Sequence, residues 1–291
     1  MKGSLLTVLL VGATAVWGWT FTVVKGAVAA YSVMGFLAAR FAIASVVLAP
    51  ISLRRTDRRT LRTGAALGAV LAAGFALQTL GLRYTSATNS GLITGLCLIF
   101  APIQDRIVFG VRPGRVVLAC LAASFTGMVV LTGQSPSEFR TGDVLTGLCA
   151  AAYGLHIVLL SRCARDHDAV ALAWVQMIAA AVLFAVLWPL LDSPAWPGAD
   201  VWWALAITGV LASAAAFYVQ TLVQQRLSAA RTAVVLTMEP VFAVFFGYLL
   251  AGDRLTGIQV IGGAMIVGSL MVAELWAALT RRRRTATTLP L

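Results

Sequence analysis

Residues 75–80 read FALQTL, and residues 217–222 read FYVQTL. The two stretches lie 142 positions apart, and the same offset matches the Ser-Ala pairs at 86–87 and 228–229. Residues 75–87 hold six identities in 13 positions at that offset. Apolar chains produce chance matches, but a shared Gln-Thr pair is harder to obtain in that way. The pattern therefore predicts an internal duplication.

The composition around these stretches is typical of a membrane protein. Of the 291 residues, 60% are hydrophobic and only 11% are charged, whereas soluble domains are about half apolar and about a quarter charged. A soluble fold would lack the polar surface to cover such a core, so we expect the excess apolar side chains to face lipid. Basic residues outnumber acidic ones by 22 to 11, which also occurs in nucleic-acid-binding proteins. Here the basic residues lie in short clusters between long apolar runs, and we expect no nucleic-acid partner.

Ten apolar runs are long enough to span a membrane as helices. The segments between them are short and leave no room for a soluble domain. The first run could instead be a cleaved signal peptide, because Ala27-Val28-Ala29 has the small-x-small pattern of a cleavage site. Its apolar stretch is longer than the apolar core of a usual signal peptide and long enough to span a membrane, so we expect it to be retained. The predicted spans are residues 5–24, 32–53, 64–84, 88–109, 114–132, 141–160, 168–191, 201–224, 231–250 and 257–279.

The distribution of Lys and Arg predicts the orientation of these spans. With the N-terminus inside, the inner segments carry 17 basic residues. The outer segments carry only Lys25, Arg83, Arg140 and Arg254. We therefore expect a multi-pass protein of a bacterial inner (plasma) membrane, with both termini in the cytoplasm.

The duplication and the number of spans together predict an inverted repeat. A unit of five spans crosses the membrane an odd number of times, so the second copy must enter from the opposite side. We expect an all-α integral membrane protein of ten transmembrane helices, built as two inverted five-helix repeats. The repeats are expected at residues 1–136 and 137–280, with a basic cytoplasmic tail at 281–291. Secondary transporters commonly have this layout, with a substrate site near the midplane between the halves.

Four groups of motifs add a resemblance to this picture. They are AVWG at residues 15–18; ARF at 39–41; TSATNSG at 85–91 with FAP at 100–102; and SAAR at 228–231 with MEPVFA at 238–243 and AGDRLT at 251–256. With these motifs the chain resembles the EamA family of the drug/metabolite transporter superfamily over essentially its whole length. The resemblance implies ten helices, cytoplasmic termini, alternating access and the export or uptake of small metabolites such as amino acids. The chain departs from the family pattern at Gln104-Asp105-Arg106, where the fourth span is usually apolar.

Arg40 and Glu239 lie inside predicted spans, where a charge costs about 2.5–3.5 kcal/mol. Glu239 precedes Pro240, and a proline at this position frees the carbonyl of Leu236 and kinks the helix. Glu239 could couple transport to protons or bind a substrate amine, or it could be a structural carboxylate near the kink or beside an arginine. Arg40 could bind a substrate carboxylate through its guanidinium fork. It could equally snorkel towards the surface or pair with Glu239.

Gln78 and Gln220 occupy equivalent positions in the two halves. Residues related by a pseudo-two-fold axis would both face a central cavity, and their amides offer donors and acceptors to a polar or zwitterionic substrate. The alternative is that they only form hydrogen bonds between helices. We take both as candidates for the cavity lining.

Four further residues are candidates for the same cavity. His156 could titrate near neutral pH and couple protons, or it could simply form a hydrogen bond with a neighbouring helix. Trp17, Tyr153 and Phe217 could stack on an aromatic or cationic substrate, or they could serve packing alone.

These features predict a secondary transporter that moves a small metabolite by alternating access. The expected cargo is an amino acid or a related zwitterionic or cationic compound, and the expected direction is efflux. The alternatives are a membrane-embedded enzyme and a lipid-handling or accessory subunit without transport of its own. An enzyme would need paired carboxylates, a metal cluster or a nucleophile with a base, so we expect no catalytic residue, metal or cofactor. The expected partners are the small-molecule substrate and membrane lipid, with a homodimer as an option.

Overall fold

The computed structural model describes residues 3–110, 114–132, 141–226, 232, 235–236, 238–250, 252, 254 and 256–287. Within these residues all regular secondary structure is helical, as the sequence predicts. In chain order the elements are α1 (Gly3–Ala30), α2 (Val33–Ser52), η1 (Leu53–Arg55), α3 (Arg58–Leu82), α4 (Ala87–Thr94), α5 (Cys97–Phe109), α6 (Arg115–Thr132), α7 (Thr141–Cys163), η3 (Ala164–Asp166), α8 (Ala169–Leu191), α9 (Ala199–Gly209), η4 (Val210–Ala215), α10 (Ala216–Arg226), α12 (Met238–Leu250) and α13 (Gly257–Thr287).

Seven segments are long and apolar enough to cross a membrane as helices. They correspond to the first four and to the sixth, seventh and eighth predicted spans. Shorter apolar helices at residues 118–127, 238–250 and 257–269 fall within the other three. Val46, Ile107 and Leu190 are 72%, 77% and 73% exposed. Because large apolar side chains cover so much of the outside, the outer surface suits lipid, and the chain is a multi-pass membrane protein.

Short polar side chains fix where several of these helices begin. An N-cap side chain accepts a hydrogen bond from one of the free N–H groups in the first turn of a helix. Asp57 accepts from Thr60 N at 2.7 Å at the start of α3, and Asp168 accepts from Val170 N and Ala171 N at the start of α8. Ser32 and Ser86 cap α2 and α4 in the same way.

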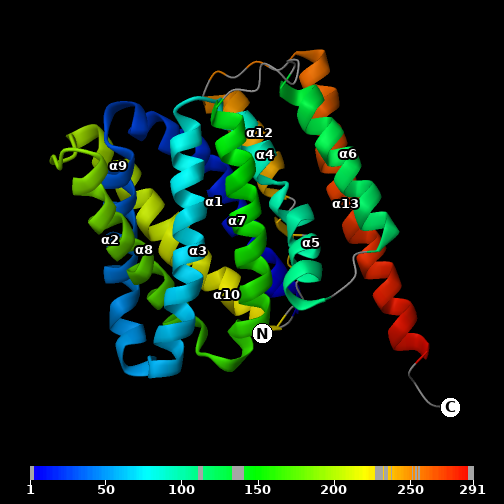
Figure 1. Cartoon of the computed structure of the whole chain (residues 1–291), viewed down its shortest axis with the longest axis horizontal. Coiled ribbons are helices and arrows are strands. Elements are labelled where there is room, and N and C mark those ends of the chain that lie inside the picture. The colour runs from blue at the N-terminus through cyan, green and yellow to red at the C-terminus, as the bar shows by residue number, and fades with distance from the viewer. Residues whose placement is uncertain are drawn as a thin grey trace.

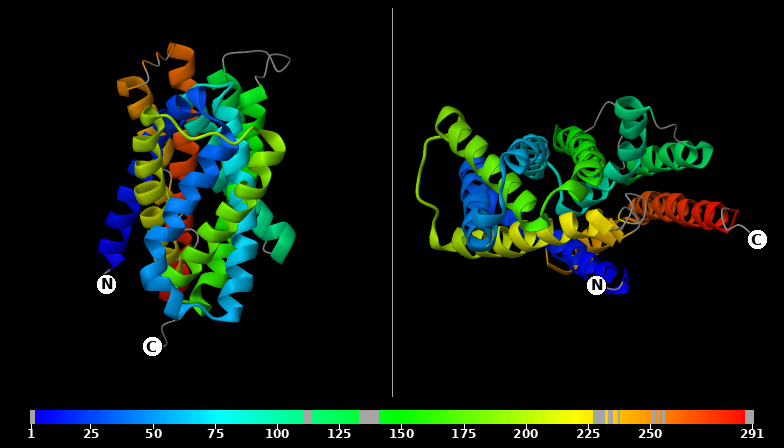
Figure 2. Two further views of the ribbon diagram at one scale, coloured as in Figure 1. Left: turned by 90° about the vertical axis from the view of Figure 1, so that its left-hand side faces the viewer. Right: turned by 90° about the horizontal axis from the view of Figure 1, so that it is seen from below.

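The helices form a bundle with a separate pair at one side. In the bundle α2 packs on α8, α3 packs on α7 and α8, and α1 packs on α12, which also contacts α4. The α6 and α13 helices pack mainly against each other, at the side of the bundle (Figure 1). A hydrogen bond between Ser124 and Ser269 joins them. The start of α1 and the end of α13 lie at the same end of the molecule as the turn between α2 and α3 (Figure 2).

The fourth predicted span, residues 88–109, is not a continuous α-helix. α4 ends at Thr94 and α5 begins at Cys97. At the break Leu98 N donates to Gly95 O at 3.2 Å, in a turn tighter than the α-helix. A Cβ atom at Gly95 would lie 2.6 Å from Pro240 Cγ on α12. The break therefore lies where α12 packs closely against this segment, which the periodicity of the fourth span does not reveal.

Other predicted boundaries also differ from the structure. The eighth predicted span, 201–224, is interrupted by a π-helical segment, η4, between α9 and α10. The helix of the tenth predicted span, 257–279, continues to Thr287. The predicted boundary between the repeats at 136 and 137, and the predicted start of the ninth span at 231, lie outside the described residues.

Candidate functional site

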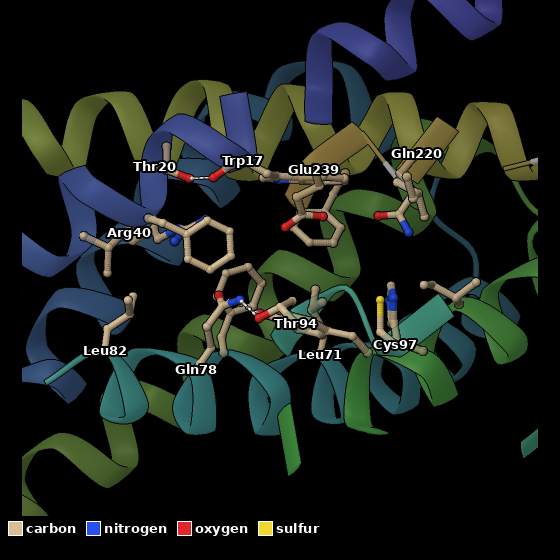
Figure 3. A pocket seen from close by; sticks show the side chains of 18 residues that line it. Trp17, Thr20, Arg40, Leu71, Gln78, Leu82, Thr94, Cys97, Gln220 and Glu239 are labelled. Carbon is tan, nitrogen blue, oxygen red and sulfur yellow. Dashed lines mark hydrogen bonds between the residues drawn. The ribbon is translucent and has the colours of Figure 1, made fainter. Parts of the chain in front are cut away.

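One cavity lies at the centre of the bundle, between α1, α2, α3, α4, α5, α7, α10 and α12. The empty space between its walls is about 650 Å³, counting the space that opens to solvent. Figure 3 shows the side chains that line it. Eight of the nine residues singled out from the sequence are among them, namely Trp17, Arg40, Gln78, Tyr153, His156, Phe217, Gln220 and Glu239. The ninth, Pro240, packs beside Gly95 instead.

Arg40 is held inside the bundle by two kinds of contact. Its side chain is only 3% exposed, which excludes snorkelling. Its Nε donates to Ser213 Oγ at 2.8 Å, and the guanidinium carbon lies 4.5 Å from the centre of the Phe75 ring. It does not pair with Glu239, since no ion pair within 4.0 Å links them. The pairing that the sequence left open is therefore absent from this structure.

The π-helical segment η4 supplies two acceptors to the same wall of the cavity. Ser213 Oγ accepts from Arg40, as described above, and the carbonyl of Ala212 accepts from Trp17 Nε1 at 2.8 Å. The wider π turn changes the direction in which backbone and side-chain groups point, and such segments occur often at functional sites. The Trp17 and Phe217 rings lie 5.4 Å apart beside it. The π-helical segment therefore orients both the Arg40 guanidinium and the Trp17 ring.

Gln78 and Gln220 line the same cavity but make different contacts. Gln78 Nε2 donates to Thr94 Oγ1 at 3.2 Å, and Gln78 Oε1 accepts from Tyr153 OH at 3.2 Å. Gln220 Nε2 donates to Gln224 Oε1 at 3.1 Å, one turn further along α10. Gln78 thus links α3 to α4 and α7, whereas Gln220 is bonded within its own helix.

His156 forms the hydrogen bond to a neighbouring helix that was one of its two possible roles. Its Nε2 lies 2.7 Å from Gln176 Oε1 on α8. Because an amide oxygen only accepts, His156 Nε2 carries the hydrogen. Gln176 Nε2 in turn donates to Leu172 O at 3.1 Å, so the ring is fixed at the back of the cavity.

Glu239 faces the cavity from the first turn of α12 (Figure 3). The side chain is half-buried and makes no hydrogen bond or ion pair with the residues that the structure describes. Among the described residues it therefore has no partner of the kind that a bonded structural carboxylate would need. The described helix begins at Met238, and residue 237 lies outside the described residues, so the kink at Pro240 stays a prediction.

Several residues that shape the cavity were not singled out from the sequence. Phe75 belongs to the repeated FALQTL pattern, so a signal was present. Thr94 and Cys97 flank the break between α4 and α5, and Ser213 lies in the π-helical segment. Nothing in the local sequence distinguishes these three from ordinary small residues of a membrane helix.

Polar contacts join the two halves of the chain at the end of the bundle where α1 begins. Arg59 pairs with Asp166 at 2.9 Å and Arg55 with Asp168 at 3.4 Å, both at exposed positions. Thr60 Oγ1 lies 2.9 Å from His167 Nδ1. Partial burial lowers the pKa of His167 below its usual value, and the nearby Arg59 lowers it further.

Different contacts join the halves at the opposite end. Thr85 Oγ1 donates to Asp143 Oδ1 at 2.6 Å, and within the first half Lys25 Nζ donates to Thr85 O at 2.9 Å. Ser32 Oγ donates to Asp192 Oδ2 at 2.6 Å. The cavity therefore lies between two polar layers, and each layer contains side chains from both halves.

The cavity chemistry suits binding of a small polar molecule. It offers one cation, one carboxylate, several amide and hydroxyl groups, and aromatic faces. Among the residues that the structure describes, no three His, Cys, Asp or Glu side chains come together in a way that could hold a metal ion.

Comparison with known proteins gives the family. The model of the EamA-like transporter family matches residues 4–133 and again residues 140–274. An uncharacterized transporter of Archaeoglobus fulgidus is 32% identical over 261 residues, covering 89% of this chain and 82% of the relative. The uncharacterized transporter YyaM of Bacillus subtilis is 26% identical over 94% of this chain and 95% of the relative. A protein of known crystal structure shares the fold with a TM-score of 0.72 at 20% identity, over 95% of this chain and 99% of that one. The chain belongs to the EamA-like transporter family.

Proposed function

We propose that this protein is a secondary transporter that moves a small polar metabolite by alternating access. The observation that carries the proposal is the central cavity, which is lined from both family-matched halves. Trp17, Arg40 and Gln78 come from the first half, and Tyr153, Gln220 and Glu239 come from the second. A site at the seam of two halves is exposed to one side or the other when the halves rock against each other.

The proposed architecture is ten transmembrane helices in two inverted repeats of five. The repeated Gln-Thr motif and the double match of the family model support it. The proposed orientation places both termini in the cytoplasm of a bacterial cell, in the inner membrane. The arginine-rich turn between α2 and α3 lies at the same end as the start of α1 and the end of α13, which supports this orientation.

The proposed cargo is an amino acid or a related zwitterionic or cationic compound, and the proposed direction is efflux. The buried charges of both signs support a substrate with polar or charged groups rather than a lipid tail. The aromatic rings of Trp17, Phe75 and Phe217 offer faces against which an apolar or cationic group of the cargo can pack.

Purified protein in proteoliposomes tests this function. A panel of labelled amino acids and cationic compounds would be followed with and without a pH gradient, against empty liposomes. We expect saturable flux of at least one compound. A panel-wide flux no greater than that of empty liposomes would contradict the proposal, and turnover of a lipid substrate in detergent would favour the enzyme alternative.

A further inference from the structure

The Arg40 guanidinium reaches the cavity with only part of its hydrogen-bonding capacity used. Its Nε is bonded to Ser213 Oγ, and one face of the group covers the Phe75 ring. Neither Nη atom makes a hydrogen bond with the residues that the structure describes, and no carboxylate lies within 4.0 Å of the group. The terminal edge of the group is thus left without a protein partner at a cavity wall (Figure 3).

A buried cation without a counter-ion is unfavourable within a membrane protein. The cost is recovered when an anion enters, because a guanidinium and a carboxylate form two parallel charge-assisted hydrogen bonds. Two edges of a guanidinium can do this: the Nε–Nη edge and the Nη–Nη edge. Ser213 occupies the Nε position, so the Nη–Nη edge remains for an incoming ligand. The contact with Phe75 fixes the plane in which that edge points.

The rest of the cavity indicates what else the ligand carries. Glu239 lines the same cavity from α12 and also has no partner among the described residues. A ligand with only positive charge would leave Arg40 unpaired. A small molecule with a carboxylate and an amine can pair with Arg40, and its amine can donate to a Glu239 oxygen whether or not that carboxyl is protonated.

We propose that Arg40 binds the carboxylate of the transported molecule end-on through its two Nη atoms, and that the protein discriminates against otherwise identical compounds that lack the carboxylate. This assignment rests on the proposed transport function and narrows its cargo. It removes purely cationic compounds from the candidate substrates. Ser213 is a positioning residue in this scheme, because it acts only through Arg40 Nε.

Matched pairs of probes test the assignment in proteoliposomes. Each pair is a labelled amino acid and its carboxamide, for example leucine with leucinamide and phenylalanine with phenylalaninamide. Empty liposomes correct for passive diffusion of the amides. We expect wild-type protein to transport at least one acid about 10-fold or more faster than its amide, as the loss of charge-assisted hydrogen bonds predicts.

Variants connect this preference to Arg40. Arg40→Gln should reduce transport of the acid to the rate of the amide. Arg40→Lys keeps the charge but not the fork, and should retain only part of the preference. Ser213→Ala should raise the KM for the acid more than it lowers kcat. Arg106→Gln is the matched control, because Arg106 donates to Gly110 O at the end of α5 and does not line the cavity; its preference should equal that of wild type.

The outcomes separate the two proposals. If wild-type protein transports amides as fast as acids, or if Arg40→Gln transports the acid at the wild-type rate, the carboxylate assignment is wrong and the transport function stands. If wild-type protein transports only compounds of the wider panel that lack a carboxylate, the assignment fails and the transport function stands. If it transports no compound of the panel, the transport function fails. If the Arg40 variants do not elute from gel filtration as a single folded species, the melting temperature of wild-type protein is measured with the acid and with the amide instead. Stabilisation by the acid and not the amide supports the assignment, and the reverse overturns it.

Discussion

Arg40 and Glu239 are charged side chains on one cavity that do not pair with each other. Most buried charges are held by a partner of opposite sign, and removal of that partner is strongly destabilising. Here the surroundings of Arg40 are a hydroxyl and an aromatic face, and Glu239 has no bonded partner among the described residues. At the scale of single residues, the site therefore keeps its charges available for a ligand.

Substitution of Glu239 tests that availability. Because Glu239→Gln breaks no hydrogen bond or ion pair with the described residues, we expect a melting temperature no lower than that of wild type. Flux of the transported compound should fall, and any stimulation by a pH gradient should disappear if the carboxylate carries the coupled proton. Differential scanning fluorimetry in detergent and proteoliposome flux are the two measurements. A marked drop in melting temperature would show that Glu239 has a structural partner after all.

The two glutamines of the repeated motif allow a second test of the cavity. Gln78→Ala and Gln220→Ala should each reduce flux several-fold while the protein still inserts into the membrane, because single side-chain hydrogen bonds in membranes contribute only about 0.6 kcal/mol. Initial rates in proteoliposomes and the amount of protein in the membrane fraction would be compared. Gln259→Ala is the control, since Gln259 bonds to Thr256 outside the cavity. Unchanged flux in both cavity variants would mean that the cavity is not the transport path.

At the scale of helices, the close approach of α4 and α12 governs the fourth span. A Cβ atom at Gly91 would lie 2.2 Å from the Cβ of Ala243, and one at Gly95 would lie 2.6 Å from Pro240 Cγ. No side chain larger than hydrogen fits at these two positions without movement of α12. The packing of α12 on α4 therefore lies next to the break between α4 and α5. It also places Glu239, the residue before Pro240, at the cavity.

Replacement of Gly91 should therefore destabilise the protein by forcing α4 and α12 apart. Gly91→Ala is expected to destabilise the protein by about 1–3 kcal/mol through overpacking. Ala243→Gly in the same chain should restore part of the loss, because it removes the atom that overlaps. Gly147→Ala in α7 is the control, since nothing lies within 4 Å of its added Cβ; it should be neutral or stabilising by up to about 1 kcal/mol. Additive losses in the double variant would contradict the direct contact.

The same scale shows what sequence patterns could and could not predict. Apolar runs predicted the places of the helices, because that signal is local. They did not predict the start of α3, which follows its cap Asp57 and precedes the predicted start at residue 64. The break at Gly95 and the π-helical segment depend on contacts with residues more than 100 positions away, Pro240 in one case and Trp17 in the other. For that reason the charges and amides of the cavity were predictable, while Ser213 and Thr94 were not.

For the whole molecule, the polar layers at the two ends of the bundle are built differently. At the end where α1 begins, the links are exposed ion pairs of Arg55 and Arg59, and such pairs contribute at most about 1 kcal/mol each. At the other end Thr85 and Asp143 are buried and joined by a short hydrogen bond. We therefore expect the end of the bundle where α1 begins to open more easily than the opposite end from the conformation described here.

His167 makes the stability of the protein depend on pH at the end of the bundle where α1 begins. Its folded-state pKa lies below the usual value of about 6.5, so folding favours the neutral ring. The stability that this contributes is present above the usual pKa and is lost as pH falls below it. We expect the melting temperature of wild-type protein to decline more steeply between about pH 7 and pH 5 than that of His167→Gln. Parallel profiles for the two proteins would exclude His167 as the source.

The hydrogen bond from Trp17 to Ala212 ends on the main chain rather than on a side chain. Every amino acid has that carbonyl, so mutation at position 212 alone does not take the acceptor away. The indole can thus stay anchored while side chains elsewhere around the ligand change over evolutionary time. Descendants of this protein could acquire new specificities with this part of the binding wall inherited intact.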